Sequence, residues 1–220
     1  NAAEHRVSLR RFVADCRKAG SATAAFVVGQ ATAMEHVRPK AAFVARPVKE
    51  LAFRLARNEW ESMQVLVAQV GRDPLERVRV SVSELRNASG AVLPSAAITV
   101  SPLGYVLTRE LPVYRRGRAQ EKIRLGWWPD PILDFPLEVS VRDGDVQSFW
   151  MRVKCPKDQP SGVYRGAARV AATCRGRRVK LTVPVIVRVN GFTLPDAPAM
   201  PLALTFAPRV HFEHMPEAYR

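Results

Sequence analysis

The stretch Phe149-Trp150-Met151-Arg152-Val153-Lys154 alternates between two sets of residues with a period of two. One set is wholly apolar, and the other contains an aromatic residue and two cations. Successive side chains of a β-strand point to opposite faces, so this alternation predicts a half-buried strand. Residues 51–56 and 77–82 show the same pattern. Further strands are expected at 26–29, 63–70, 98–107, 136–141, 162–174 and 178–189.

Turn chemistry connects these strand-like runs. Asp143-Gly144 and Arg175-Gly176 each predict a tight hairpin, and residues 87–90 predict a polar turn. The runs follow one another without the helical patterns that a parallel α/β sheet needs for its crossovers. We therefore expect an all-β fold, an antiparallel β-sandwich of immunoglobulin or jelly-roll type, preceded by one helix.

The N-terminal residues have a different period. Apolar residues at helical spacing, followed by a glycine cap, predict an amphipathic helix over residues 4–19; the residues are Leu9, Phe12, Val13, Cys16 and Gly20. The apolar stripe of this helix needs a partner surface.

The residue composition changes again after residue 193. A proline-punctuated linker begins there, and a short apolar run at 202–206 is typical of a buried strand. We therefore expect an N-terminal helix and lead-in (1–24), a β-sandwich accessory domain (25–193), and a linker followed by the first strand of a missing domain (194–220).

The chain is strongly basic. It has 34 Lys+Arg against 20 Asp+Glu, which gives a formal net charge of +14. Such a charge can attract polyanions. However, the tightest clusters, 115–118 and 175–178, are not interleaved with the aromatic side chains on which single-strand binders stack bases. We therefore expect no nucleic-acid partner.

Membrane, metal and cofactor sites are not indicated. The chain contains no run near the roughly 20 apolar residues of a membrane span. His211 and His214 flank Glu213, but no third histidine or cysteine completes a metal site. We expect no membrane partner, no metal and no cofactor.

Glu59 and Glu61 are the candidate carboxylate pair, with Arg57 close by in sequence. Two positions apart on a strand, they would project from the same face. Paired carboxylates act as general acid and base when they lie about 5 to 9.5 Å apart with the scissile bond between them. No third group stands out that would make one carboxylate the acid and the other the base. The alternative to a catalytic role is that the two carboxylates belong to a buried or interfacial hydrogen-bond network.

Trp127, Trp128 and Asp130 form the other candidate site, in a cluster that we interpret as a proline-locked turn. Three roles remain open. The indoles could stack on sugar rings while Asp130 accepts from hydroxyls. They could anchor an interface with another domain. They could also plug one end of the sandwich.

Several motifs together resemble the N-terminal domain of glycoside hydrolase family 123 and its uncharacterised bacterial relatives. They occur in family order over about residues 25 to 206 and include Leu55-Ala56-Arg57-Asn58-Glu59-Trp60-Glu61-Ser62-Met63-Gln64, Gly104-Tyr105-Val106, Gly126-Trp127-Trp128-Pro129-Asp130-Pro131, Gln147-Ser148-Phe149-Trp150, Pro160-Ser161-Gly162-Val163-Tyr164-Arg165-Gly166 and Phe192-Thr193-Leu194-Pro195.

The resemblance implies a β-sandwich that precedes a (β/α)8 barrel. In that family the barrel carries an acid pair that works with the N-acetyl group of β-linked N-acetylgalactosamine. None of those residues can be assigned here, because the chain ends where we expect the first barrel strand to begin.

The expected function is therefore that of a non-catalytic accessory domain of a larger glycoside hydrolase-like protein, with the downstream barrel as its partner. The expected location is secreted, periplasmic or at the cell surface. The alternative function is a carbohydrate-binding module that uses the Trp127 and Trp128 platform, which would make a glycan the partner.

Overall fold

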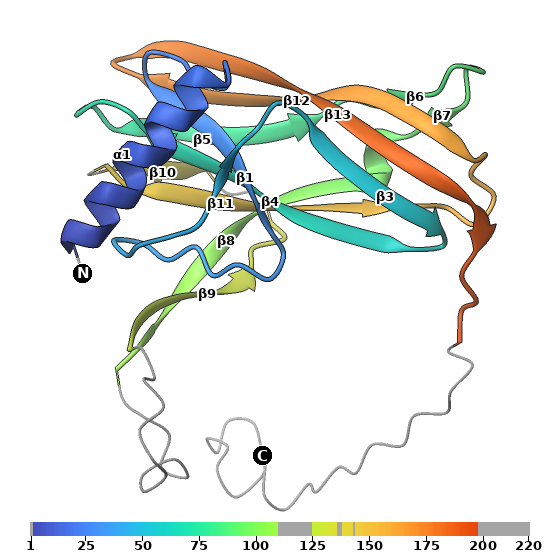
Figure 1. Ribbon diagram of the computed structural model, residues 1–220, viewed down its shortest axis with the longest axis horizontal. Helices are drawn as coiled ribbons and strands as arrows, with labels where there is room; N and C mark the ends of the chain where they lie inside the picture. Colours follow the sequence, from blue (N-terminus) through green and yellow to red (C-terminus); the bar gives the residue numbers. More distant parts are fainter. Residues whose placement is uncertain (1, 110–124, 136–137, 143, 198–220) are drawn as a thin grey trace, which may run out of the picture.

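The computed structural model describes residues 2–109, 125–135, 138–142 and 144–197, which fold as two β-sheets packed face to face with one helix outside them (Figure 1). In chain order the elements are α1 (Ala2–Lys18), β1 (Phe26–Thr32), β2 (Arg46–Pro47), β3 (Leu51–Arg57), β4 (Trp60–Gln69), β5 (Leu75–Val82), β6 (Leu85–Arg86), β7 (Val92–Leu93), the 3-10 turn η1 (Ser95–Ala97), β8 (Ile98–Thr108), β9 (Gly126–Ile132), β10 (Val139–Val141), β11 (Val146–Lys154), β12 (Gly162–Cys174) and β13 (Arg177–Thr193).

The strands divide between a six-stranded and a seven-stranded sheet. The first has the order β2-β1-β4-β11-β8-β9. The second has the path β10-β5-β12-β13-β3, with β6 pairing to β12 and β7 pairing to β6. Most neighbours are antiparallel, as the sequence predicts, but β3 runs parallel to β13. The all-β sandwich with an N-terminal helix is confirmed.

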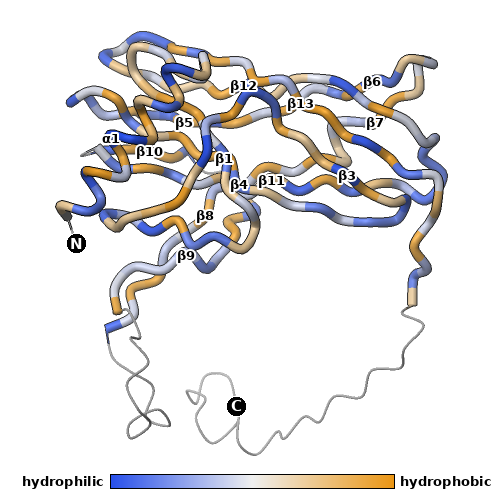
Figure 2. The backbone as a smooth tube through the Cα atoms, in the orientation of Figure 1, coloured by the Kyte–Doolittle hydropathy of each residue, from blue (hydrophilic) through white to orange (hydrophobic). Residues whose placement is uncertain are grey.

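The main core lies between the two sheets and follows the period of two (Figure 2). Along β13, Val183, Val185, Val187 and Val189 are buried, while the residues between them face outward. Side chains from β3, β4 and β11 meet these valines from within the same core. Burying a valine or leucine side chain contributes about 1.5–3 kcal/mol, so this continuous layer accounts for much of the stability of the fold.

Helix α1 lies on the outer face of the six-stranded sheet and forms a second, smaller core with it (Figure 1). Phe12 and Cys16 of the helix pack with Val27 and Leu66 of the sheet. Burial raises the pKa of the Cys16 thiol to about 11, so the group stays protonated, and it donates to the carbonyl oxygen of Val28 at 3.4 Å. The apolar stripe expected on the helix is therefore buried, and the surface that it packs against is the six-stranded sheet of the sandwich.

His5 holds the first turns of α1 in place. Its ring is buried, with Nδ1 at 2.8 Å from the carbonyl oxygen of Ala41 and Nε2 at 3.2 Å from that of Gly144. The two acceptors lie far apart in sequence, so one side chain joins the helix to two separate loops.

Two of the three predicted turns are confirmed. Arg175 and Gly176 both have positive φ, 50° and 70°, and they connect β12 to β13 with Cys174 opposite Arg177. This is the two-residue hairpin that matches the twist of paired strands. In the turn between β6 and β7, the Asn87 side chain accepts from the Ala91 amide at 2.8 Å.

The hairpin predicted at Asp143-Gly144 is wrong. β10 pairs with β5 in one sheet, whereas β11 lies between β4 and β8 in the other. The chain therefore crosses from one sheet to the other at this point instead of folding back on itself. Asp143 itself lies outside the described residues.

The final part of the predicted division cannot be followed. The sandwich is described through Thr193, and the first linker residues through Ala197. The apolar run at 202–206 and the group His211, Glu213 and His214 lie outside the described residues.

Candidate functional site

The corner between β3 and β4 carries Arg57, Glu59 and Glu61. These two strands belong to different sheets, so the chain turns sharply there. Asn58 has a left-handed φ of 63°, which asparagine tolerates better than most residues. Its amide donates to the carbonyl oxygen of Cys155 at 2.9 Å, and the Cys155 amide donates to Glu59 at 2.9 Å. The corner is thus fixed against the end of β11.

Glu59 lies at the corner just before β4 and only Glu61 lies within the strand, whereas the prediction placed both on one strand. Glu59 precedes the first residue of β4 and its Oε2 accepts from the Ala56 amide at 2.5 Å, so the carboxylate braces the corner. Glu61 lies within β4, and its Oε1 accepts from the adjacent Ser62 amide at 3.2 Å. A local backbone role therefore describes Glu59 better than the role of a general acid.

The corner also holds the segment by which the chain leaves the sandwich, residues 193–197, which we call the exit segment. The Leu194 amide donates to the carbonyl oxygen of Arg57 at 2.9 Å. The Asn58 side-chain amide donates to the Leu194 carbonyl oxygen at 3.1 Å and to Asp196 Oδ1 at 3.0 Å, and Lys157 pairs with Asp196. These bonds set the direction in which the chain continues.

We expect substitution of Asn58 to loosen the exit segment. Asn58→Gly keeps the left-handed backbone but removes the two side-chain bonds to the exit segment and the bond from Lys154, whereas Asn58→Ala also adds left-handed strain of about 1 kcal/mol. Amide hydrogen exchange at Leu194 should accelerate in both variants. The alanine variant should have the lower free energy of unfolding. Unchanged exchange at Leu194 in both would show that Asn58 does not hold the segment.

The exit segment should also respond to pH. Hydrogen bonds from Lys157 first, and from Asn58 second, hold the pKa of Asp196 below its ordinary value of 3.8. A lowered carboxyl pKa stabilises the folded contact above the ordinary value, and that contribution is lost as pH falls through the lowered one. An NMR titration should show the Asn58 and Leu194 amide signals moving with Asp196 at a pH below 3.8. Titration at the ordinary value, with no change at Asn58, would contradict this.

Arg57 stabilises the same corner from the other side. Its Nε donates to the carbonyl oxygen of Gln159 at 2.8 Å, and the Gln159 side chain donates to Val92 at 3.1 Å. Tyr164, which is fully buried, donates through its hydroxyl to Pro160 at 2.6 Å. Arg57 is therefore a structural brace of the loop at 156–160.

The outer face of the six-stranded sheet beyond α1 carries aromatic and cationic side chains, and we call it the open face. Trp150, Arg152 and Lys154 alternate along β11 and so share this face, with Trp60 of β4 directly opposite Lys154. The Trp60 side chain is 54% exposed, with Lys154 Nζ 5.2 Å and the Arg152 guanidinium 5.8 Å from its ring centre. Both distances suit cation–π attraction.

An ion pair fixes Arg152 on the open face. Its Nη2 donates to Asp134 Oδ2 at 2.8 Å, and its Nε donates to Thr99 at 3.2 Å. Hydrogen bonds from Ser101 first and then Arg152 lower the pKa of Asp134. The cation is thus oriented before any partner arrives.

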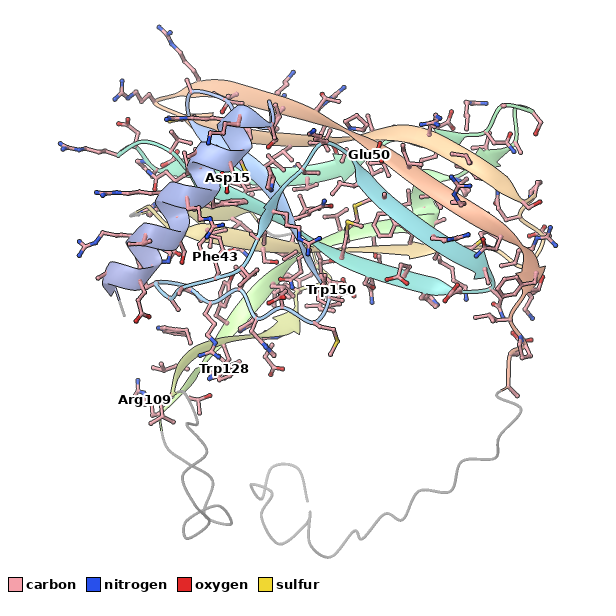
Figure 3. The ribbon with its side chains drawn as sticks, viewed as in Figure 1. Asp15, Phe43, Glu50, Arg109, Trp128 and Trp150 are labelled. Carbon is pink, nitrogen blue, oxygen red and sulfur yellow. The ribbon has the colours of Figure 1, made fainter. Side chains whose placement is uncertain are left out.

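Trp127, Trp128 and Asp130 lie in strand β9, which corrects the prediction of a turn. β9 pairs with the second half of β8, and the two extend from the sandwich as an arm, on which Trp128 is labelled (Figure 3). Neighbours on a strand face opposite ways, so the two indoles cannot form one platform. Trp127 is 48% exposed, whereas Trp128 is half-buried beneath Arg38, whose guanidinium lies 3.6 Å from the ring centre.

Asp130 is exposed and lies where the register of β9 against β8 shifts. Because the two indoles face opposite ways, the expected set of two stacking indoles and one accepting carboxylate is not assembled. The exposure of Trp127 also argues against a plug in the sandwich end.

The exit-segment contacts and the Arg152–Asp134 pair escape sequence reasoning. Asn58 and Asp196 are 138 positions apart, and Arg152 of β11 and Asp134, which follows β9, are 18 positions apart. Asparagine after arginine at a strand end is the available local signal, because asparagine favours left-handed turns.

Within the described ranges, no group of three or more histidine, cysteine or acidic side chains could hold a metal ion. Among the described elements, no helix is long and apolar enough to cross a membrane.

The fold and the motifs agree with one protein family. The model of the glycoside hydrolase 123 N-terminal domain matches residues 34–172, so the chain belongs to this family. No curated protein matches the chain in sequence.

One solved structure of the same family has the same fold. A family 123 glycoside hydrolase from Clostridium perfringens, described in a study of glycolipid glycan hydrolysis, aligns with a TM-score of 0.61 and 18% identity, over 77% of this chain and 28% of that chain. The present chain therefore spans little more than a quarter of that protein. The CooA pilin subunit of enterotoxigenic Escherichia coli aligns with a TM-score of 0.35 and 12% identity, over 74% of this chain and 98% of that chain.

Proposed function

We propose that this chain is a non-catalytic accessory β-sandwich of a larger glycoside hydrolase-like protein. Its role is to pack against a downstream (β/α)8 domain that acts on glycans containing N-acetylhexosamine. We further propose that the parent protein is secreted, periplasmic or on the cell surface. Membership of the family and the 28% coverage of the Clostridium perfringens enzyme support a role as one part of a longer protein.

The main support for the proposal is that the exit segment is held by hydrogen bonds and an ion pair. A flexible linker between independent domains needs no such contacts, whereas here Arg57, Asn58 and Lys157 all bind residues 194–196. A fixed exit lowers the entropy that docking of the next domain would otherwise cost.

Exposed apolar side chains at the same end provide a surface for that docking. Trp60 and Phe192 are 54% and 58% exposed, and Leu194 is also exposed. The adjacent open face adds Trp150 and the oriented Arg152. Tryptophan and arginine are enriched at the centres of interfaces, and apolar residues rimmed by charges are typical of a surface that another domain covers.

The candidate carboxylates support an accessory role rather than catalysis. Glu59 accepts the Ala56 amide and so serves the corner between β3 and β4. We expect the isolated chain to show no turnover of aryl N-acetylgalactosaminides. A longer protein that includes the proposed downstream domain, assayed under the same conditions, is the comparison. Clear turnover by the isolated chain, lost on Glu61→Gln, would contradict the proposal.

The carbohydrate-binding alternative now depends on Trp127 alone, because its indole is half exposed while Trp128 faces the other way. We expect titration with N-acetylhexosamine oligosaccharides to leave the tryptophan fluorescence unchanged. A saturable change that disappears in Trp127→Ala but persists in Trp60→Ala would favour the binding module over the accessory role.

A further inference from the structure

The outer face of the seven-stranded sheet is densely basic, and α1 lies on the opposite side of the sandwich. The strand alternation directs a set of cations outward, and we call this surface the basic face. It consists of Arg54, Arg79, Arg86, Arg165, Arg169, Arg178, Lys180 and Arg188, all exposed.

The register of the strands places these cations side by side. Arg54 on β3 lies opposite Arg188 on β13, and Arg86 on β6 lies opposite Arg165 on β12. Neighbouring strands are about 4.8 Å apart, and like charges directly opposite one another on such strands are unfavourable. The fold places like charges together here at a cost to its own stability.

Carboxylates neutralise only part of the basic face. Arg79 donates to Glu138 at 2.8 Å and Arg86 pairs with Glu84. Within the described part of the chain, the other cations of the face have no carboxylate within ion-pair distance. These cations can therefore bind anions from outside the chain.

Uncharged side chains occupy the positions between the cations, and they include the apolar residues Val163 and Ile186. Ala171 lies between Arg79 and Lys180, whereas Ser81 and Thr182 flank Arg169. Arg79 and Lys180 therefore stand about two strand spacings, roughly 10 Å, apart, and hydroxyl groups lie on both sides of Arg169. A linear polymer with regularly repeated anions could lie across the basic face.

The chemistry of the face favours an acidic glycan over a nucleic acid. Guanidinium groups bind carboxylate, sulfate and phosphate in a bidentate manner. Single-strand binders also need aromatic side chains for base stacking. Along the paired lengths of β12 and β13 that the structure describes, no outward residue is aromatic. The exposed tryptophans Trp60 and Trp127 lie on strands of the other sheet.

We propose that the basic face binds a linear acidic polysaccharide, through repeated carboxylate or sulfate groups held by arginine. The choice of a glycan rests on the proposed function as part of a glycoside hydrolase-like protein. The site is separate from the exit segment and the open face, so it would hold a polymer while the downstream domain stays docked.

Binding of the whole chain to polygalacturonate and to heparin, measured by calorimetry over a range of salt concentrations, tests this proposal. Polygalacturonate offers carboxylates and heparin mainly sulfates, dextran is the uncharged control, and duplex DNA is the competing polyanion. The test variant is Arg169→Gln/Arg188→Gln. The matched control is Arg6→Gln/Arg10→Gln, which removes the same charge from the exposed side of α1.

The test variant should weaken binding to at least one acidic glycan by about tenfold or more, since each lost pair of charged hydrogen bonds is a sizeable part of the affinity. Its salt dependence should fall by about two counterions. The control variant should bind like the parent chain.

Three results would overturn the proposal: equal loss in both variants, no binding to either acidic glycan at low salt, or tighter binding of DNA than of either glycan. None of them would affect the accessory role, which the turnover assay and the exit segment test independently.

Discussion

Replacing Tyr164 with alanine should lower the free energy of unfolding by about 3–5 kcal/mol, the largest effect that we expect from a single substitution. Tyr164 is fully buried in the main core, and it is among the largest side chains there. Truncation leaves a cavity between the sheets and removes the hydroxyl that donates to Pro160. The loop at 156–160, against which Arg57 is braced, should then loosen as well.

Tyr164→Phe is the matched control, since it keeps the ring and removes only the hydrogen bond. It should cost about 1 kcal/mol. Chemical denaturation of both variants gives the two values. A loss below about 1.5 kcal/mol for Tyr164→Ala would mean that the two sheets do not share the tightly packed core described above.

Replacing Gly29 with alanine should detach α1 from the sheet. A Cβ at this position of β1 would lie 2.4 Å from two ring atoms of Phe12 and 2.6 Å from the carbonyl oxygen of Arg46. The ring can move only by leaving the second core, and the backbone oxygen belongs to the neighbouring strand β2. Overpacking of this kind costs about 1–3 kcal/mol.

Gly191→Ala is the control, because no atom lies within 4 Å of a Cβ built there. Trypsin should cleave α1 at its exposed arginines, Arg10 and Arg11, faster in Gly29→Ala than in the parent chain. Equal cleavage of Gly29→Ala, Gly191→Ala and the parent would show that α1 does not depend on this close contact.

Sequence alone was sufficient for half-buried strands such as β3 and β11, because only one face of each is buried. Burial imposes a period of two, which is visible wherever polar and apolar residues alternate, as in β3 and β11. The helix was similarly readable from the stripe that includes Phe12 and Cys16.

The wrong predictions for the turn at Asp143-Gly144 and for Glu59 arose because the residues of a turn do not specify the sheet to which the next strand belongs. Asp143-Gly144 has the composition of a hairpin turn, yet the chain changes sheets there, and no local residue encodes that choice. The chain also changes sheets at the corner between β3 and β4. Glu59 lies in this corner and therefore not in the strand that the sequence predicted for it.

The Trp127 region was misread because of its prolines. Pro129 and Pro131 suggested a turn, but β9 is an edge strand of the six-stranded sheet. Proline is tolerated at an edge, where its missing amide need not bond to a further strand. The separation of the two indoles follows from that assignment.

The two outer faces of the sandwich therefore differ in character. The six-stranded sheet carries α1, the open face and the arm, with exposed tryptophan side chains available for a protein partner. The seven-stranded sheet carries the exposed cations of the basic face, which suit a polyanion. A division of this kind would let one accessory domain support its neighbour and hold a substrate polymer at the same time.

Hydroxyl-radical footprinting of Trp60 tests the accessory role most directly. The oxidation rate of Trp60 would be compared between the present chain and the longer protein that includes the downstream domain. Trp60 is half exposed here and lies two positions after Asn58, which holds the exit segment, so we predict that its oxidation rate falls in the longer protein while that of Met34, which is 86% exposed, stays high. Equal oxidation of Trp60 in the two proteins would contradict the account.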